Sequence, residues 1–174
     1  MRLFFALSLD HANRYTIAAF QQQRFSGNGR SIPAQNLHVT LLFIGEVEQS
    51  RIIKLASETD KLVCDSFDLT MDHLEFFPAN GMVWLTASSI PSGLHRLYQL
   101  LRGVAVRNSI KTDRKPFRPH ITLIRNVTSP PAAETQVPPI SLRCEDFTLF
   151  QSVQGPQGFR YIALEEWSLI RNMQ

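Results

Sequence analysis

Two short copies of one sequence pattern are the residues best suited to chemistry. The chain contains Leu-His-Val-Thr-Leu once and His-Ile-Thr-Leu once, so that the pair His38 and Thr40 recurs as His120 and Thr122. Two imidazoles with pKa values of about 6.5 can serve as acid and base at neutral pH. Two hydroxyls can donate hydrogen bonds to phosphate oxygens. The pattern therefore suits cleavage of a phosphodiester without a metal, in which one group activates water and another protonates the departing oxygen.

Both copies lie in segments rich in β-branched and aliphatic residues, which predicts strands over residues 37–45 and 120–125. Side chains two residues apart point to the same face of a strand, so each His shares a face with its Thr. Each strand follows a predicted helix and a basic, proline-containing loop. We therefore expect two related halves whose His-Thr pairs face each other across a central cleft. The alternative interpretation is that each His is a core residue hydrogen-bonded to its own Thr.

The other elements are strands and helices in mixed order, with hairpins and no repeated strand–helix crossover of uniform length. This order favours an α+β fold with antiparallel sheets over a doubly wound parallel sheet. No break in composition marks a linker, so residues 1–174 are expected to form one domain with an internal duplication. Trp84, in the strand segment Val-Trp-Leu, is expected in the core. The periodicities predict helices over 12–24, 49–63 and 91–107, strands over 3–9, 67–77, 82–87, 147–151 and 161–164, and a proline-rich loop over 128–139.

Composition excludes several classes of protein. The chain is 44% hydrophobic and 19% charged, which excludes disorder as its main state. The apolar run Leu3–Leu9 is far shorter than the roughly 20 residues of a membrane-spanning helix, so no membrane association is expected. Two cysteines form neither a disulfide framework nor a zinc motif, which favours reduced thiols and a cytoplasmic location. His73 and Glu75 share a strand face and could bind a metal, but no third ligand is evident.

Basic charge is concentrated in one part of the chain. Seven arginines and lysines lie between Arg102 and Arg125, against the single acid Asp113. Such a segment suggests an anionic partner, such as a phosphate or a nucleic acid. The alternative is a solvated helix face followed by a solvated loop.

The chain resembles a known family. It is similar to the two-histidine phosphoesterase superfamily, and most of all to the bacterial RNA 2′,3′-cyclic phosphodiesterases, also called 2′-5′ RNA ligase-like proteins. The resemblance covers nearly the whole chain and rests above all on the two His-x-Thr motifs. The segments that carry it are RLFFALSLD, NLHVTLLFIGEV, MVWL, KPFRPHITLIRN and RYIALEEWSL.

The resemblance implies a bilobal α+β fold, with two pseudo-two-fold-related lobes of antiparallel sheet and helices around a cleft. It implies an enzyme that hydrolyses RNA 2′,3′-cyclic phosphate ends to a 2′-phosphomonoester, with RNA ends or small cyclic nucleotides as substrates. It implies no metal and no cofactor, and we expect a monomer.

The resemblance also implies roles for individual residues. His38 would be the proton donor and His120 the proton acceptor, although the near-symmetry of the motifs alone allows either assignment. Thr40 and Thr122 would bind the phosphate. Phe43 and Arg125 would sandwich the terminal base. Strict alternation would place these two residues opposite the histidines, so the strands must end or bulge before them.

Two other functions remain compatible with the same residues. One is a module that binds RNA ends without turnover, which needs the basic segment but not both histidines. The other is a 2′-5′ RNA ligase that runs the reaction in reverse with an RNA 5′-hydroxyl as nucleophile. The site cannot distinguish ligation from hydrolysis, although water at about 55 M favours hydrolysis. The absence of a glycine-rich phosphate-binding loop argues against an ATP-dependent ligase.

Overall fold

A computed structural model describes residues 1–112, 116–129, 136–156 and 158–170. The described helices are too short or too polar to span a bilayer. They are α1 (His11–Phe25), the short 3₁₀ helix η1 (Ala34–Asn36), α2 (Gln49–Thr59) and α3 (Ser92–Arg107). Asp10 caps α1 through its side chain, which accepts a hydrogen bond from the backbone N–H of Asn13.

The strands form two sheets, and neighbouring strands within each sheet are antiparallel. This confirms the α+β prediction. The four-stranded sheet has the order β3 (His38–Glu46), β1 (Arg2–Ser8), β8 (Asp146–Gly155), β9 (Gly158–Ser168). The five-stranded sheet has the order β2 (Arg30–Ser31), β6 (His120–Arg125), β5 (Met82–Thr86), β4 (Phe67–Phe77), β7 (Gln136–Cys144).

The two sheets repeat one connection. In the first, α1 joins β1 to its antiparallel neighbour β3, and in the second, α3 joins β5 to its antiparallel neighbour β6. On the far side of β1 lie β8 and β9, and on the far side of β5 lie β4 and β7. The molecule therefore has two lobes related by an approximate two-fold axis. β3 and β6, which carry the His-x-Thr motifs, occupy equivalent places in them.

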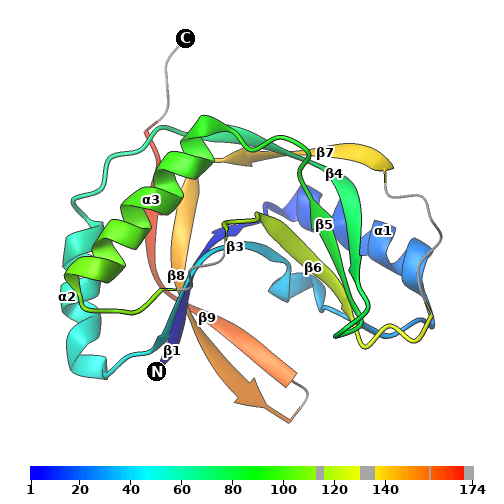
Figure 1. Ribbon diagram of the computed structural model, residues 1–174, viewed down its shortest axis with the longest axis horizontal. Coiled ribbons are helices and arrows are strands. Elements are labelled where there is room, and N and C mark those ends of the chain that lie inside the picture. Colours follow the sequence, from blue (N-terminus) through cyan, green and yellow to red (C-terminus); the bar gives the residue numbers. More distant parts are fainter. Residues whose placement is uncertain (113–115, 130–135, 157, 171–174) are drawn as a thin grey trace.

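The helices connect the lobes as well as covering them. α1 leaves the first sheet but contacts β2 and β6 of the second, while α3 leaves the second sheet but contacts β3 of the first as well as β4 and α2. Figure 1 shows α2 and α3 together on one side of the molecule and α1 on the other. Apolar side chains from both sheets and all three α-helices join one hydrophobic core. The motif strands are thus held by packing that crosses between the lobes.

Several predicted elements have other bounds in the structure. The second helix ends at Thr59 instead of residue 63. The segment predicted as a loop over 128–139 contains the start of β7, where prolines are tolerated because β7 is an edge strand; residues 130–135 lie outside the described residues. The strands predicted over 147–151 and 161–164 extend to the full lengths of β8 and β9.

Candidate active site

A cleft of about 750 Å³ is lined by all six residues that the resemblance assigned to catalysis, phosphate binding or base binding. β3 and β6 belong to different sheets but lie close to each other, so their outward faces line the same cavity. β3 contributes His38, Thr40 and Phe43, and β6 contributes His120, Thr122 and Arg125. The two His-Thr pairs therefore open into one cleft, although they are about 80 residues apart in the chain.

The two histidine rings are held by matching hydrogen bonds. Nδ1 of His38 lies 2.7 Å from the carbonyl oxygen of Asn36, and Nδ1 of His120 lies 2.8 Å from the carbonyl oxygen of Arg118. A carbonyl can only accept, so each Nδ1 must carry the proton. In the neutral rings, Nε2 is then the nitrogen with a lone pair, and it is the atom available for proton transfer.

The surroundings of the two rings differ. Nε2 of His38 lies 3.0 Å from the Thr40 hydroxyl. This contact is the one expected if His38 were a core residue hydrogen-bonded to its own Thr. However, His38 also lines the cleft and is only partly buried. Its ring meets Phe4 at 5.1 Å and the edge of Tyr161 at 5.0 Å between centroids.

His120 is fixed by a ring that sequence reasoning assigned to the core. Its imidazole stacks on the indole of Trp84, with centroids 3.6 Å apart and planes within 10°. The core prediction for Trp84 is wrong, because Trp84 is only partly buried and lines the cleft. The alternation of side chains along a strand could have indicated this exposure. Val83 and Leu85 are fully buried, so Trp84 between them points to the opposite face of the strand.

Both motif strands contain a β-bulge at equivalent positions. These bulges explain how Phe43 and Arg125 come to lie on the cleft face. In β3 the register shifts so that Leu41 is the extra residue between Thr40 and Leu42. In β6 the extra residue is Leu123. Each bulge lies three residues after the motif histidine and resets the alternation of side chains. Phe43 and Arg125 therefore share a face with the histidines, as the sequence analysis required.

The cleft lowers the basicity of both imidazoles. Burial lowers the pKa of His38 to about 4, and the charges of His120 and Arg125 act in the same direction, against the hydrogen bond to Asn36. Burial also lowers the pKa of His120. Both rings are therefore neutral at pH 7 in the substrate-free protein. An anion bound between them would raise both pKa values, because it favours the charged imidazolium.

Unpartnered donors in the cleft are suited to an anion. Among the described residues, Arg125 has no carboxylate or hydrogen-bond acceptor, and the Thr122 hydroxyl has no partner. The Arg125 guanidinium and the Thr122 hydroxyl provide donors for the oxygens of a phosphate, whereas the Thr40 hydroxyl donates to Nε2 of the neutral His38 and is released for a phosphate oxygen when His38 is protonated.

Two of the described arginines of the basic segment line the cleft. Arg118 and Arg125 line it, whereas Arg107 pairs with Glu58 on α2. Arg114 and Lys115 lie outside the described residues.

The possible metal pair has other partners. Glu75 accepts from Arg118, and Nδ1 of His73 lies 3.0 Å from a carboxylate oxygen of Asp72. Within the described ranges, no three His, Cys, Asp or Glu side chains gather as a metal site.

Comparisons with known proteins agree with this geometry. The family model of the 2′-5′ RNA ligase superfamily matches residues 8–156. The RNA 2′,3′-cyclic phosphodiesterase of Escherichia coli is 34% identical over 97% of this chain and 96% of that protein. The Thermus thermophilus RNA 2′,3′-cyclic phosphodiesterase is 33% identical over 97% of this chain and 90% of that protein.

Solved structures extend the similarity to three dimensions. The crystal structure of E. coli LigT complexed with 3′-AMP matches with a TM-score of 0.89 and 32% identity, covering 97% of each chain. The MHV ns2 PDE domain shares the fold alone, with a TM-score of 0.60 and 12% identity over 94% of this chain and 99% of that one. With a duplicated His-x-Thr cleft and relatives at this identity over almost its full length, the chain belongs to the 2′-5′ RNA ligase superfamily, among the RNA 2′,3′-cyclic phosphodiesterases.

Proposed function

We propose that this protein hydrolyses the 2′,3′-cyclic phosphate at RNA ends to a 2′-phosphomonoester by acid–base catalysis with two histidines and no metal. The observation that carries the proposal is the pair of imidazoles with anchored Nδ1 atoms, His38 and His120, lining one cleft. The names of the relatives support the same activity.

In the proposed reaction, Nε2 of His120 takes a proton from water as its oxygen attacks the phosphorus. The bond from phosphorus to the ribose 3′ oxygen breaks, and the Nε2 proton of a protonated His38 goes to that oxygen. Thr40 and Thr122 hydrogen-bond the non-bridging oxygens, where negative charge develops in the transition state. After the step His120 carries the proton taken from water and His38 has lost one, so release of a proton from His120 and uptake of a proton by His38 restore the starting state.

The same proposal covers the substrate end and the protonation of the donor. Phe43 and Arg125 share the cleft face with the histidines, and we propose that they hold the terminal base between a ring and a guanidinium. His38 is neutral in the substrate-free protein at pH 7, so the negative charge of the bound phosphodiester must raise its pKa before it can donate. The co-crystal of LigT with 3′-AMP supports a substrate that ends in a nucleotide.

We further propose a monomeric protein in the cytoplasm, with residues 1–174 as one domain built by duplication. The shared hydrophobic core supports a single domain. The two free, buried cysteines, Cys64 and Cys144, are in keeping with a reducing compartment.

The test is the rate of His38→Ala and His120→Ala on two substrates. On an RNA oligonucleotide with a cyclic phosphate end, each variant should lose roughly 10²–10⁴-fold in kcat. On a p-nitrophenyl phosphodiester the leaving group needs little protonation, so His38→Ala should recover most of its rate and His120→Ala should not.

The matched control is His95→Ala, which removes an exposed imidazole on α3 and should leave both rates unchanged. Rescue of His120→Ala instead would reverse the two roles. Wild-type rates in both variants would contradict catalysis by the two histidines, and a wild-type protein without turnover would leave binding of RNA ends as the function. All assays include EDTA, and loss of turnover there would contradict a reaction without a metal.

A further inference from the structure

An ion pair includes the residue whose carbonyl holds the ring of His120. The guanidinium of Arg118 donates to both carboxylate oxygens of Glu75, at 2.6 and 2.5 Å. Arg118 is also the residue whose carbonyl accepts the Nδ1 hydrogen of His120. The Glu75 carboxylate on β4 thus anchors the side chain of the same residue whose backbone holds the ring.

Glu75 also pairs with the residue that stacks on the ring of His120. In the pairing of β4 with β5, Glu75 lies opposite Trp84, and Trp84 stacks on His120. In the pairing of β5 with β6, Trp84 lies opposite Thr122 and Thr86 lies opposite His120. The ring of His120 is therefore held on one face by the indole of Trp84. At Nδ1 it is held by the carbonyl of Arg118, whose side chain is bound to Glu75 on β4.

The pair also sets opposing charges next to the imidazole. The Arg118 charge lowers the pKa of His120 and the Glu75 charge raises it, on top of the larger lowering by burial. Removing either charge alone would leave the other uncompensated. The other titratable or charged residues that line the cleft are Arg2, His38, Tyr98, Arg125 and Tyr161.

We propose that Glu75 and Arg118 are positioning residues that orient His120 and balance the charge around it, so that this ring and not its partner is prepared to accept a proton. The assignment of a catalytic role to His120 rests on the proposed function. The contacts of Arg118 and Trp84 with the ring, and of Glu75 with Arg118, do not.

The experiment measures the pKa of His120 in the substrate-free protein by NMR titration, in wild type, Glu75→Gln, Arg118→Gln and the double variant. Glu75→Gln should lower this pKa and Arg118→Gln should raise it, while the double variant should return it toward the wild-type value. Opposite signs show that both charges act on the ring, and a loss of kcat separates positioning residues from an ion pair that contributes only to stability, which would leave kcat unchanged. Kinetics on the cyclic RNA end should show kcat reduced by roughly three- to tenfold in each single variant, with KM within about twofold.

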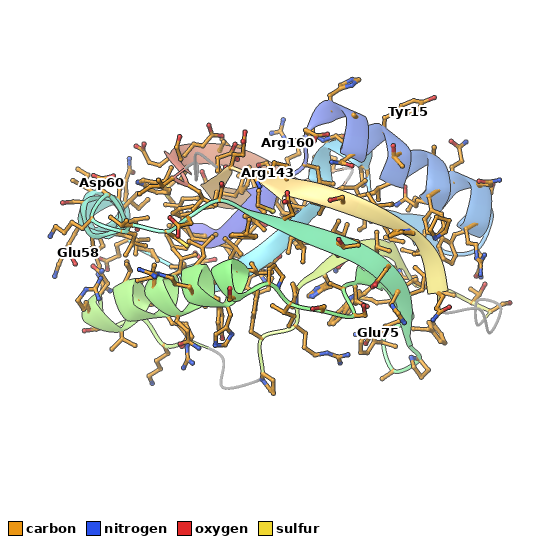
Figure 2. All side chains as sticks on the ribbon, turned by 90° about the horizontal axis from the view of Figure 1, so that it is seen from above. Tyr15, Glu58, Asp60, Glu75, Arg143 and Arg160 are labelled. Carbon is orange, nitrogen blue, oxygen red and sulfur yellow. The ribbon has the colours of Figure 1, made fainter. Side chains whose placement is uncertain are left out.

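The matched control is Glu58→Gln, which breaks a similar carboxylate–arginine contact between α2 and α3. Figure 2 shows Glu58 at one end of the molecule and Glu75 well away from it. This control should leave the pKa of His120 and kcat unchanged.

Shifts of the same sign in the two single variants, or no shift, would overturn the inference. The titration decides the matter without turnover, whereas a wild-type protein with no cyclic phosphodiesterase activity would overturn the proposed function alone.

Discussion

The two histidines of the repeated motif have unlike surroundings. His38 touches Phe4, Tyr161 and its own Thr40, whereas His120 has one face covered by Trp84 and no bond to Thr122 among the described residues. Burial lowers the pKa of both rings. A duplicated motif thus supplies two chemically similar groups, and their neighbours make them different enough for separate roles.

The stack between Trp84 and His120 leads to a test with graded substitutions. Trp84→Phe keeps a ring against the imidazole, and it loses no polar contact because the indole Nε1 has no hydrogen-bond partner in the described parts of the chain. Trp84→Leu removes the stack, whose contribution of about 1 kcal/mol corresponds to roughly fivefold in rate. We expect kcat near wild type for Trp84→Phe and several-fold lower for Trp84→Leu, measured on a cyclic RNA end. Equal kcat values for the two variants would show that the stack does not matter.

At the scale of elements, one buried amide supports the bulge in β6. Gln21 on α1 is 4% exposed, and its side-chain nitrogen donates to the carbonyl oxygens of Leu123 at 2.6 Å and Ile32 at 3.0 Å. Leu123 is the residue that resets the alternation before Arg125. A helix that starts from the other sheet therefore stabilises the irregularity that brings the guanidinium into the cleft.

Gln21→Met should weaken this support while keeping a side chain of similar length. The loss of two hydrogen bonds from a buried site should reduce the free energy of unfolding by about 1–3 kcal/mol, measured by urea denaturation. KM should rise more than kcat falls, because the bulge at Leu123 brings Arg125 into the cleft, where it is proposed to bind the terminal base. Gln22→Met, at an exposed neighbouring position, is the control and should change neither quantity. Unchanged stability and KM in Gln21→Met would contradict the role of Gln21 in supporting the bulge and substrate binding.

At the scale of the whole molecule, the site exists only because two lobes meet. Neither sheet contains both histidines, since β3 and β6 belong to different sheets and approach each other across the cleft. The exchange of α1 and α3 between the lobes links this approach to the common core. Burial of His38 is also the main reason for its low pKa, so protonating this ring costs more free energy in the folded protein than in the unfolded chain.

Stability should therefore depend on pH through His38. Its pKa is about 4 in the folded protein and about 6.5 in the unfolded chain, so the unfolded chain binds the proton more strongly. The free energy of unfolding should be constant above pH 6.5 with respect to this group and fall as pH drops toward 4, by about 3 kcal/mol in total.

Urea denaturation at several pH values measures this dependence, with His38→Gln as the variant that cannot titrate. The variant should have a flatter curve between pH 6.5 and 4. Asp72, whose pKa is lowered to about 2 mainly by its hydrogen bond to Ser88, loses its contribution below that window and should affect both proteins alike. Parallel curves for the two proteins would contradict the burial of a neutral His38.

The sequence alone determined the chemistry-bearing residues and most of the elements. His38, Thr40, His120 and Thr122 could be found because their spacing matches the period of a strand, and the three α-helices because apolar residues recur at the period of a helix. The hairpin of β4 and β5 followed from local turn residues. The start of β7 was missed because its two prolines are turn signals in the sequence, and only its edge position makes them compatible with a strand.

Only the tertiary structure decided what surrounds those residues. Strand pairing is non-local, so the sequence did not reveal that Trp84 lies opposite Thr122 or that Glu75 reaches Arg118. The bulge at Leu123 also depends on its neighbours, since its carbonyl accepts from Gln21 on a helix about 100 residues away. The residues that perform the chemistry could be recognised from local pattern, whereas those that orient them and set their charge depend on contacts that form only when the two lobes pack together.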